Sequence, residues 1–570
     1  MSLHLLVTRW LPPRPTITAV QLSWGLTLLL VLFYNGPLWR LILSLDAADG
    51  LHRWLFAGAF LLFMVALFQF VLSFLSWPRL IKPLALLLIL SAALASHFMD
   101  SYGVLFDRSM MQNLFETDPA EVSDLLTPQL FWRLLWQGVL PVLLLLWVRV
   151  RPLSLGRQLT GLAVSLGLCL LLIGANAALL YKDYSSLFRN HREIRNLALP
   201  SSYLYYGARY LAGAYDKAST PFKPLGLDAV RVEQGVQAVG SQTARPDLLI
   251  VVLGETARSQ NFGLNGYVRD TTPELERLPV VSFTDVTACG TSTAVSVPCM
   301  FSLMPRDRYD QERADNQSNV LDILQRAGLD VRWEENNSGC KGVCQRITRV
   351  DIRPSQENAH CRGESCFDAQ LLQALQQQLQ ALDHSALIVL HQQGSHGPAY
   401  YKRVPPEFEA FTPICRSSAL QSCSRESIVN AYDNSLRYTD HLLAQLIALL
   451  QQERRFNSAM LYLSDHGESL GENNLYLHGM PWLLAPQEQK KVPLITWLSE
   501  GFQQRHGIDM ECLAAQRDRP LNHDYLAHSL LGLMEVQTSV YDADLDLFAG
   551  CRGQNRQMAA VAAQSAASGG

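Results

Sequence analysis

The first third of this 570-residue chain is far more apolar than the rest. Before about residue 182, Leu, Val, Phe and Trp dominate, whereas charged residues, Gln, Asn and Pro become frequent afterwards. A helix needs about 20 apolar residues to span a bilayer, and we predict five such spans. The first should be retained in the mature protein, because no small-residue cleavage site follows it. The predicted spans lie near residues 17–34, 54–77, 80–98, 130–148 and 159–181.

Charges beside the spans predict how the chain is oriented. Basic residues favour the cytoplasmic side of a membrane, and here they occur on alternate flanks. The segment between the third and fourth spans is instead acidic, so it should face outward. Five spans that begin inside place the carboxy-terminal half outside. The basic flank residues are Arg9, Arg14, Arg79, Lys82, Arg149, Arg151 and Arg157.

The cysteines support this orientation independently. Ten of the 11 cysteines follow the apolar part, mostly in close pairs, and only Cys169 lies within it. Such clustering is typical of disulfides in an oxidising compartment, although ten free thiols remain an alternative. The spacing does not match that of a zinc ribbon.

The composition also suggests how the chain is divided. We predict a transmembrane domain over residues 1–182, an interfacial linker over 183–244, a globular domain over 245–552 and a disordered tail over 553–570. The outward segment 106–126 is amphipathic, and its periodicity favours a helix lying on the membrane surface over one that contacts a lipid headgroup. A net charge of -4 without a long basic run gives nucleic-acid binding little support.

From residue 245 the pattern alternates between strands and helices. Continuous apolar runs such as "DLLIVVLGE", "SALIVLHQQGSHG" and "SAMLYLSDHGESLGE" indicate strands buried on both faces, as in an α/β domain with a mostly parallel sheet. Polar residues follow three of these strands directly, and sites form outside the carboxyl ends of parallel strands. We therefore expect one crevice to contain Glu255, His391, His396, Asp465, His466 and Glu468.

Two carboxylates and an imidazole, from Glu255, Asp465 and His466, suit Zn²⁺ with an open position, and Mn²⁺ as the second choice. A hydrogen-bonded cluster without a metal is the alternative. The nearby segment "ACGTSTAVSVPCM" contains four hydroxyl residues between Cys289 and Cys299. A metal activates a hydroxyl as a nucleophile, and a disulfide would hold this segment, contributing about 2–3 kcal/mol. The spacing does not choose among the four hydroxyls.

Several long motifs, in this order, resemble those of the lipid A phosphoethanolamine transferases, membrane-anchored members of the alkaline phosphatase/sulfatase-like superfamily. The similarity covers nearly the whole chain except the tail and parts of the linker. The motifs are "DRSMMQNLFETDPAE", "GETARSQNFGLNGY", "CGTSTAVSVPCMFS", "NNSGCKGVC", "HQQGSHGPAYYKR", "NAYDNSLRYTD" and "SDHGESLGENNLYLHGMP".

The resemblance implies a role for individual residues. Thr293, the second threonine of C-G-T-S-T, is the implied nucleophile, and the implied zinc ligands are Glu255, Thr293, Asp465 and His466. His396 and His478 match histidines near the transferred group, which sometimes bind a second metal, and Lys341 matches a lysine that contacts the phosphate. The positions that match the phosphoethanolamine pocket, contrary to the periodicity of the outward segment, are Asn113, Thr117, Glu121 and Ser338.

The resemblance also implies a function and a location. The expected reaction moves phosphoethanolamine from phosphatidylethanolamine to a phosphate of lipid A through a covalent threonine intermediate, which would reduce envelope charge and give polymyxin resistance. The catalytic domain would lie in the periplasm, anchored by several spans in a bacterial inner membrane. Family members have periplasmic disulfides, and sequence proximity suggests the pairs 289–299, 340–344, 361–366, 415–423 and 512–551.

Three alternatives share much of this pattern. A related enzyme could transfer phosphoethanolamine or phosphoglycerol to core oligosaccharide or a periplasmic glucan. A hydrolase would use water as the acceptor. A non-catalytic membrane sensor with a sulfatase-like outer domain would tolerate loss of Thr293, but the intact set of ligand types argues against it.

Overall fold

The computed structural model describes residues 14–45, 50–117, 119–232, 245–352, 361–362 and 365–553. The chain divides into two compact units, which we call the membrane unit and the globular unit. The membrane unit comprises Met1–Met111 and Leu126–Arg209, and the globular unit comprises Gln112–Leu125 and Tyr210–Gly570. Part of the outward amphipathic segment therefore belongs with the globular unit.

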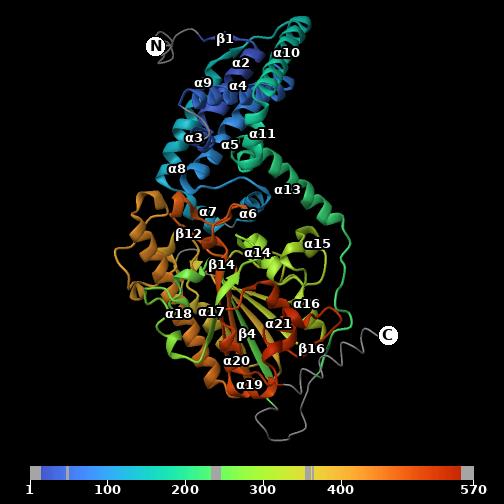
Figure 1. The fold of residues 1–570 in the computed structure, drawn as a ribbon, viewed down its shortest axis with the longest axis vertical. Coiled ribbons are helices and arrows are strands. Elements are labelled where there is room, and N and C mark those ends of the chain that lie inside the picture. Colours follow the sequence, from blue (N-terminus) through green and yellow to red (C-terminus); the bar gives the residue numbers. More distant parts are fainter. Residues whose placement is uncertain are drawn as a thin grey trace, which may run out of the picture. The chain divides into compact units, whose positions relative to one another are not determined.

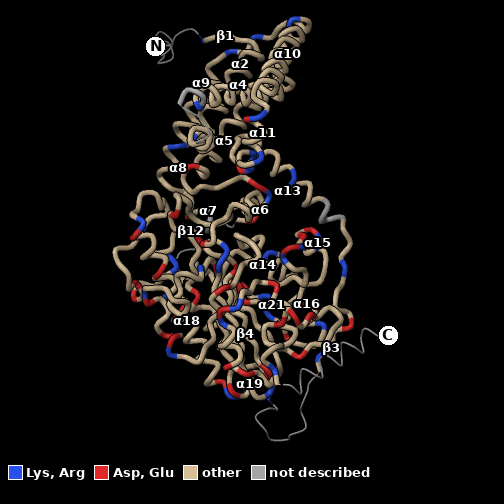
Figure 2. The backbone as a smooth tube through the Cα atoms, in the orientation of Figure 1, with Lys and Arg blue, Asp and Glu red and all other residues tan. Residues whose placement is uncertain are grey.

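The membrane unit is built from long apolar helices that carry few charges (Figure 2). Among the described residues, four helical segments are long and apolar enough to cross a membrane. A fifth span is present if the pair α2 and α3, bent by 62°, is one span. The predicted five spans therefore agree only roughly with the structure. The helices are α2 (Ala19–Phe33), α3 (Gly36–Ser44), α4 (Gly50–Phe74), α5 (Ile81–Tyr102), α8 (Pro128–Arg133), α9 (Leu140–Trp147), α10 (Leu155–Leu179), α11 (Tyr181–Asn190), α12 (Ile194–Leu197) and α13 (Ser201–Ser219).

A buried polar cluster joins three of these helices. Gln69 Nε2 on α4 donates to Ser23 Oγ on α2 at 2.9 Å and to Ser165 Oγ on α10 at 3.2 Å. Gln69 Oε1 also accepts from Thr27 Oγ1 at 2.8 Å. Apolar faces alone do not select partners within lipid, so such hydrogen bonds fix which helices pack together.

An eight-stranded sheet forms the centre of the globular unit (Figure 1). Its order is β15-β5-β14-β11-β4-β10-β6-β7, and β4, β10, β11, β6 and β7 run parallel to their neighbours within this part of the sheet. Only β14 is antiparallel, to both β11 and β5. The strands are β4 (Asp247–Gly254), β5 (Val281–Thr287), β6 (Asp330–Glu335), β7 (Thr348–Asp351), β10 (Ala386–His391), β11 (Asn457–Ser464), β14 (Lys491–Leu498) and β15 (Leu521–Asn522).

Helices cover both faces of this sheet, which explains why its strands are apolar throughout. One hydrophobic core includes residues of α14, α16 and α21, and a second includes residues of α17 and α18. The predicted α/β fold with a mainly parallel sheet is therefore confirmed. The helices are α14 (Thr293–Met300), α15 (Gln311–Asp315), α16 (Val320–Arg326), α17 (Ala369–Leu379), α18 (Arg425–Gln452), α19 (Glu500–His506), α20 (Met510–Ala515) and α21 (Asp524–Leu533).

Short strands outside the main sheet pair locally. β12 (Ser469–Leu470) pairs with β13 (Tyr476–Leu477), β8 (Cys361–Arg362) pairs with β9 (Ser365–Cys366), and β3 (Val230–Arg231) pairs with β16 (Val536–Gln537). In the membrane unit, β1 (Thr16–Ile17) pairs with β2 (Arg149–Val150).

Five disulfides connect the predicted pairs of cysteines, and Cys169 is free and buried. The predicted pairing by proximity is thus reproduced in full. Four of the five join cysteines separated by no more than ten positions. They therefore hold individual loops, whereas Cys512–Cys551 closes a separation of 39.

The outward amphipathic segment forms two short helices rather than one. α6 covers Arg108–Glu116, and α7 covers Pro119–Leu125. Pro119 begins α7, a position at which the missing backbone N–H of proline costs no hydrogen bond. Within the globular unit, Gln112 Nε2 donates to Ala294 O at 3.1 Å, and Asp124 pairs with Lys402 and Arg403.

Candidate active site

Parallel strand pairing brings the three predicted ligand residues together. β4 and β11 lie side by side with Gly254 opposite Ser464, so the residues that follow leave the sheet at the same point. Glu255, Asp465 and His466 are fully buried there, and each has a ligand atom within 4.8 Å of those of the other two. His466 Nε2 lies 3.4 Å from Glu255 Oε1.

The strand order also places the hydroxyl-rich segment at this edge. β5 is antiparallel to β14, which is antiparallel to β11, so β5 and β11 end at the same edge. Thr293 begins α14, and its Oγ1 donates to Glu255 Oε2 at 3.0 Å and lies 3.3 Å from His466 Nε2. A helix amino terminus also favours negative charge.

The other hydroxyls of this segment have different surroundings. Thr291 Oγ1 donates to Met480 O at 2.7 Å, and Ser296 Oγ donates to Asp465 O at 2.6 Å. Ser292 Oγ is buried without a hydrogen-bond partner among the described residues. The tertiary structure therefore distinguishes the four hydroxyls, which the spacing did not.

The electrostatics of the cluster suit a cation. Burial alone would raise the pKa of Glu255, but the imidazoles of His466, His396 and His478 lower it below the ordinary value. Burial, and then the Glu255 carboxylate, raise the pKa of Asp465. Asp465 Oδ2 accepts no hydrogen bond within the described part of the chain. Two adjacent buried carboxylates are costly unless a positive charge compensates them, and this donor set fits Zn²⁺.

His396 and His478 lie beside this cluster. The ring centroid of His478 is 4.3 Å from that of His466 and 5.7 Å from that of His396. Glu468, also predicted at this edge, is fully buried, accepts from Tyr400 at 2.6 Å and lies 2.8 Å from His478 Nδ1. Glu468 is therefore positioned to orient His478.

Lys341 connects Ser338 with the end of α6. Lys341 has a positive φ of 48°, and its Nζ donates to Ser338 O at 2.9 Å and to Glu116 O at 3.5 Å. Thr117 Oγ1 donates to Asn113 O at 2.6 Å. The side chain of the remaining predicted pocket residue, Glu121 in α7, lies outside the described residues.

Two further residues, which no pattern in the sequence singles out, contact the predicted ligands. Thr256 has a φ of 59°, which is strained for a β-branched residue. Its hydroxyl donates to Glu255 Oε1, and its amide donates to Asp465 Oδ1 at 3.1 Å. Asn337 Nδ2 donates to Glu255 Oε2 at 2.7 Å. Both residues lie within motifs quoted above, but nothing local marks the strained backbone of Thr256.

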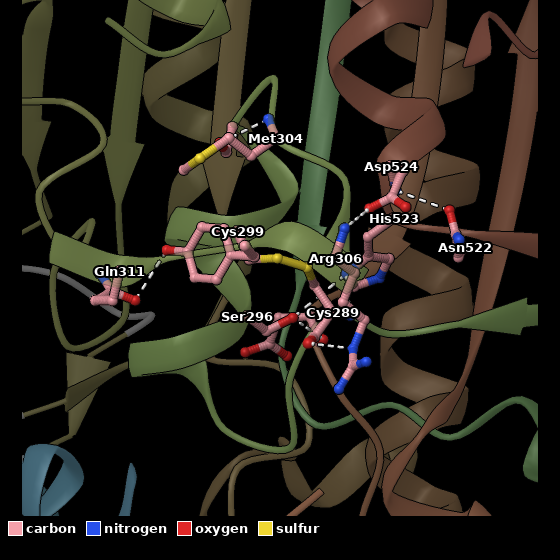
Figure 3. The surroundings of a disulfide bond; sticks show 12 residues. Cys289, Ser296, Cys299, Met304, Arg306, Gln311, Asn522, His523 and Asp524 are labelled. Carbon is pink, nitrogen blue, oxygen red and sulfur yellow. Dashed lines mark hydrogen bonds between the residues drawn. A yellow bond between two sulfur atoms is a disulfide. The ribbon is translucent and has the colours of Figure 1, made fainter. Parts of the chain in front are cut away.

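Histidines 391 and 523 support neighbouring loops. His391 is buried, 3.1 Å from Glu335 and 3.3 Å from Asn337, as a structural residue at the end of β10. His523, beside Cys289 in Figure 3, accepts at Nδ1 from Cys289 N at 3.0 Å. Its Nε2 donates to Ser464 O at 3.0 Å. Burial lowers the pKa of His523 to about 3, consistent with this neutral tautomer. It joins the segment before Thr293 to the end of β11.

Two known families match different parts of the chain, one mainly the apolar part and the other the globular part. A family described as "Sulfatase" matches residues 247–536. A second, described as "Phosphoethanolamine transferase EptA/EptB", matches residues 64–215. The two matches together cover most of both units.

Individual relatives match nearly the entire length. Phosphoethanolamine transferase EptA of Escherichia coli K12 is 40% identical over 552 residues, covering 95% of this chain and 98% of that protein. Phosphatidylethanolamine transferase Mcr-1 of Escherichia coli is 40% identical over 474 residues, covering 81% and 85%. The solved lipooligosaccharide phosphoethanolamine transferase A of Neisseria meningitidis has a TM-score of 0.88 at 34% identity, covering 94% of this chain and 99% of that one.

Proposed function

This chain belongs to the phosphoethanolamine transferase family of the alkaline phosphatase/sulfatase-like superfamily, and on that basis we propose that it transfers phosphoethanolamine from phosphatidylethanolamine to a phosphate of lipid A. The observation that carries the proposal is the position of the Thr293 hydroxyl, 3.0 Å from Glu255 Oε2 and 3.3 Å from His466 Nε2. A hydroxyl in such a cluster suits covalent phosphoryl transfer.

Zinc would be held by Glu255, Asp465, His466 and the Thr293 hydroxyl. When bound, it would supply positive charge that favours the threonine alkoxide and offsets charge on the phosphoryl oxygens. Asp465 Oδ2 is buried and accepts no hydrogen bond among the described residues, which supports this assignment. A second zinc near His396 and His478 is a further part of the proposal, supported by the buried carboxylate of Glu468 beside His478.

The reaction proceeds in two displacements. The Thr293 hydroxyl gives up its proton toward Glu255, which accepts its hydrogen bond. Oγ attacks the phosphorus of phosphatidylethanolamine, and the bond from phosphorus to the diacylglycerol oxygen breaks. His396 or His478 gives a proton to that oxygen, and diacylglycerol leaves. An oxygen of a lipid A phosphate then attacks phosphorus, the bond to Thr293 Oγ breaks, and the threonine hydroxyl regains a proton.

Charged and polar groups around Thr293 bind the transferred group. The Lys341 ammonium adds positive charge where negative charge develops on the phosphoryl oxygens. Its contacts with Ser338 and Glu116 support a pocket that also includes Asn113, Thr117 and Glu121. The amino terminus of α14, at Thr293, also favours the negative charge of the phosphoryl group, but more weakly.

The membrane unit would give the lipid donor access to this site. We expect five spans in a bacterial inner membrane, with the amino terminus cytoplasmic and the globular unit in the periplasm. Five disulfides in the globular unit support that orientation. In intact spheroplasts, a membrane-impermeant thiol reagent should label a cysteine introduced at Lys182 but not one at Arg157.

Intact-mass spectrometry of the full-length protein tests the covalent step. After incubation with phosphatidylethanolamine, the wild type should carry a phosphoethanolamine adduct at Thr293, and Thr293→Ala should carry none. Full turnover with an unmodified Thr293 would refute the covalent scheme.

Separate assays with lipid A, core oligosaccharide and glucan would identify the acceptor. Lipid A modification should add an amine, reduce the negative charge of the envelope and weaken binding of cationic peptides. Cells that produce the wild type, but not Thr293→Ala, should then resist polymyxin.

A further inference from the structure

Two cationic side chains lie over the same indole ring, close to the segment that contains Thr293. Arg306 Cζ lies 3.3 Å and Lys490 Nζ lies 5.0 Å from the centroid of the Trp482 ring. All three side chains are partly exposed. Within the described part of the chain, neither cation has a carboxylate oxygen within ion-pairing distance of its side chain. The Asp524 carboxylate accepts from the backbone amide of Arg306 and raises the pKa of the Arg306 side chain, but by less than burial lowers it. The pair is therefore a positive site that one nearby carboxylate offsets only in part.

Keeping these two charges close is unfavourable without an anion. Burial, and then the charge of Arg306, lower the pKa of Lys490, and burial lowers that of Arg306. Stacking on Trp482 compensates part of this cost. A bound anion would compensate more, since charge-assisted hydrogen bonds to phosphate are among the stronger ones.

Hydrogen bonds connect this cluster to the segment that contains Thr293. Arg306 Nε donates to Cys289 O at 2.8 Å (Figure 3). The backbone carbonyl of Lys490 accepts from Ala288 N at 2.7 Å. Thr291 Oγ1 donates to Met480 O at 2.7 Å, two positions before Trp482. The cluster is thus tied to the segment that leads into Thr293.

An apolar surface continues from the two cations. Leu483, next to Trp482, is 82% exposed, and Leu484 is 37% exposed. Adjacent positive and apolar surfaces fit an amphiphile with an anionic head rather than a soluble anion. They also differ from the Lys341 pocket, whose contacts are polar.

We propose that Arg306, Lys490 and Trp482 bind a second, non-reacting phosphate monoester of the acceptor lipid, with Leu483 against its apolar part. This inference rests on the proposed function, because it assumes a lipid acceptor with two phosphates. One phosphate would lie on the two cations while the other reaches the phosphoethanolamine on Thr293. The site would then select acceptors by their number of phosphates.

Kinetics with paired acceptors test this site in the full-length, zinc-loaded protein. Initial rates are measured with bis-phosphorylated and mono-phosphorylated lipid A in neutral detergent micelles. Lys490→Gln should reduce kcat/KM for the bis-phosphorylated acceptor about ten-fold, mainly through KM, since it removes one charge-assisted contact. With the mono-phosphorylated acceptor the change should be less than about two-fold. The kcat/KM of Arg306→Lys for the bis-phosphorylated acceptor should lie between the values for the wild type and for Lys490→Gln.

Two controls separate binding from folding. Arg308→Gln removes a cation two positions from Arg306 whose side chain is 77% exposed. This variant should leave kcat/KM unchanged for both acceptors. The rate of adduct formation from phosphatidylethanolamine, which precedes acceptor binding, should be unchanged in Lys490→Gln.

Several outcomes would overturn the inference. Equal losses with both acceptors, or no loss with either, would show that the cluster does not bind a second phosphate. A loss that appears only after anionic phospholipid is added would assign the cluster to bulk lipid. Inorganic phosphate that inhibits wild type and Lys490→Gln equally would exclude an anion site. A wild type that forms the adduct but modifies neither lipid would instead refute the proposed acceptor.

Discussion

Thr256 and Asn337 hold the Glu255 carboxylate from two sides. The Thr256 hydroxyl donates to Oε1, and Asn337 donates to Oε2, the oxygen that also accepts from Thr293. Residues that orient a metal ligand change affinity without touching the metal. The positive φ of Thr256 costs about 1–3 kcal/mol, which the surrounding contacts must offset.

Replacing Thr256 separates its hydroxyl from its backbone strain. Thr256→Val keeps the β-branched shape but removes the donor to Glu255, so zinc affinity should fall about 10- to 100-fold. Thr256→Ser keeps the donor and should remain close to wild type. Competition with a chromogenic chelator measures the zinc affinity of both variants. Equal affinities for Val and Ser would contradict this role for the hydroxyl.

His523 makes the segment before Thr293 sensitive to acid. Its folded pKa of about 3 lies below the ordinary 6.5, so its stabilising contribution is complete above about pH 6.5 and is lost as the pH falls toward 3. The loss is about 1.4 kcal/mol per pH unit in that window. A protonated Nδ1 could no longer accept from Cys289 N.

Thermal unfolding of the detergent-solubilised protein between pH 4 and about 7 measures this effect. The melting temperature of the wild type should fall more steeply with acidification than that of His523→Gln, which has no proton to gain. Parallel curves would show that His523 is not responsible. At pH 7 the variant should be the less stable of the two, because Gln cannot reproduce both hydrogen bonds of the buried ring.

Each of two disulfides in the globular unit constrains a different segment. Cys289–Cys299 encloses the turn and most of the helix that present Thr293, whereas Cys512–Cys551 lies between α20 and the chain beyond α21. Loop entropy predicts a larger effect on stability for the longer loop. The shorter loop should matter more for catalysis, because it holds Thr293, the proposed nucleophile.

The two disulfides can be compared in paired serine variants. Cys512→Ser with Cys551→Ser should reduce the unfolding free energy by about 4 kcal/mol, and Cys289→Ser with Cys299→Ser by about 3 kcal/mol. At a temperature where both variants are folded, only the second should lose much of its rate of adduct formation. Equal rates would mean that hydrogen bonds alone hold the segment.

At the scale of the molecule, a metal would join segments that are far apart in the sequence. Glu255, Asp465 and His466 directly follow strands β4 and β11, and Thr293 begins the helix that follows β5. Without a cation, two buried carboxylates repel each other, as the raised pKa of Asp465 indicates. A bound metal should therefore stabilise the whole globular unit.

Removal of the metal tests this expectation. Dialysis of the full-length protein against a zinc chelator should lower its melting temperature and abolish adduct formation, and stoichiometric zinc should restore both. Asp465→Asn should make the melting temperature insensitive to the chelator, because it removes a ligand and the repulsion together. A wild type whose stability does not change on chelation would argue against a buried metal.

Local patterns were sufficient for the strands, the disulfide partners and the three ligand types, and only roughly for the spans, because each depends on hydropathy or on neighbours in sequence. The ligand edge was also predictable, since parallel strands end together. The choice of Thr293 among four hydroxyls, the strained Thr256 and the pairing of Arg306 with Lys490 around Trp482 were not. They depend on strand order and on how distant loops pack, and no local sequence signal encodes these long-range contacts.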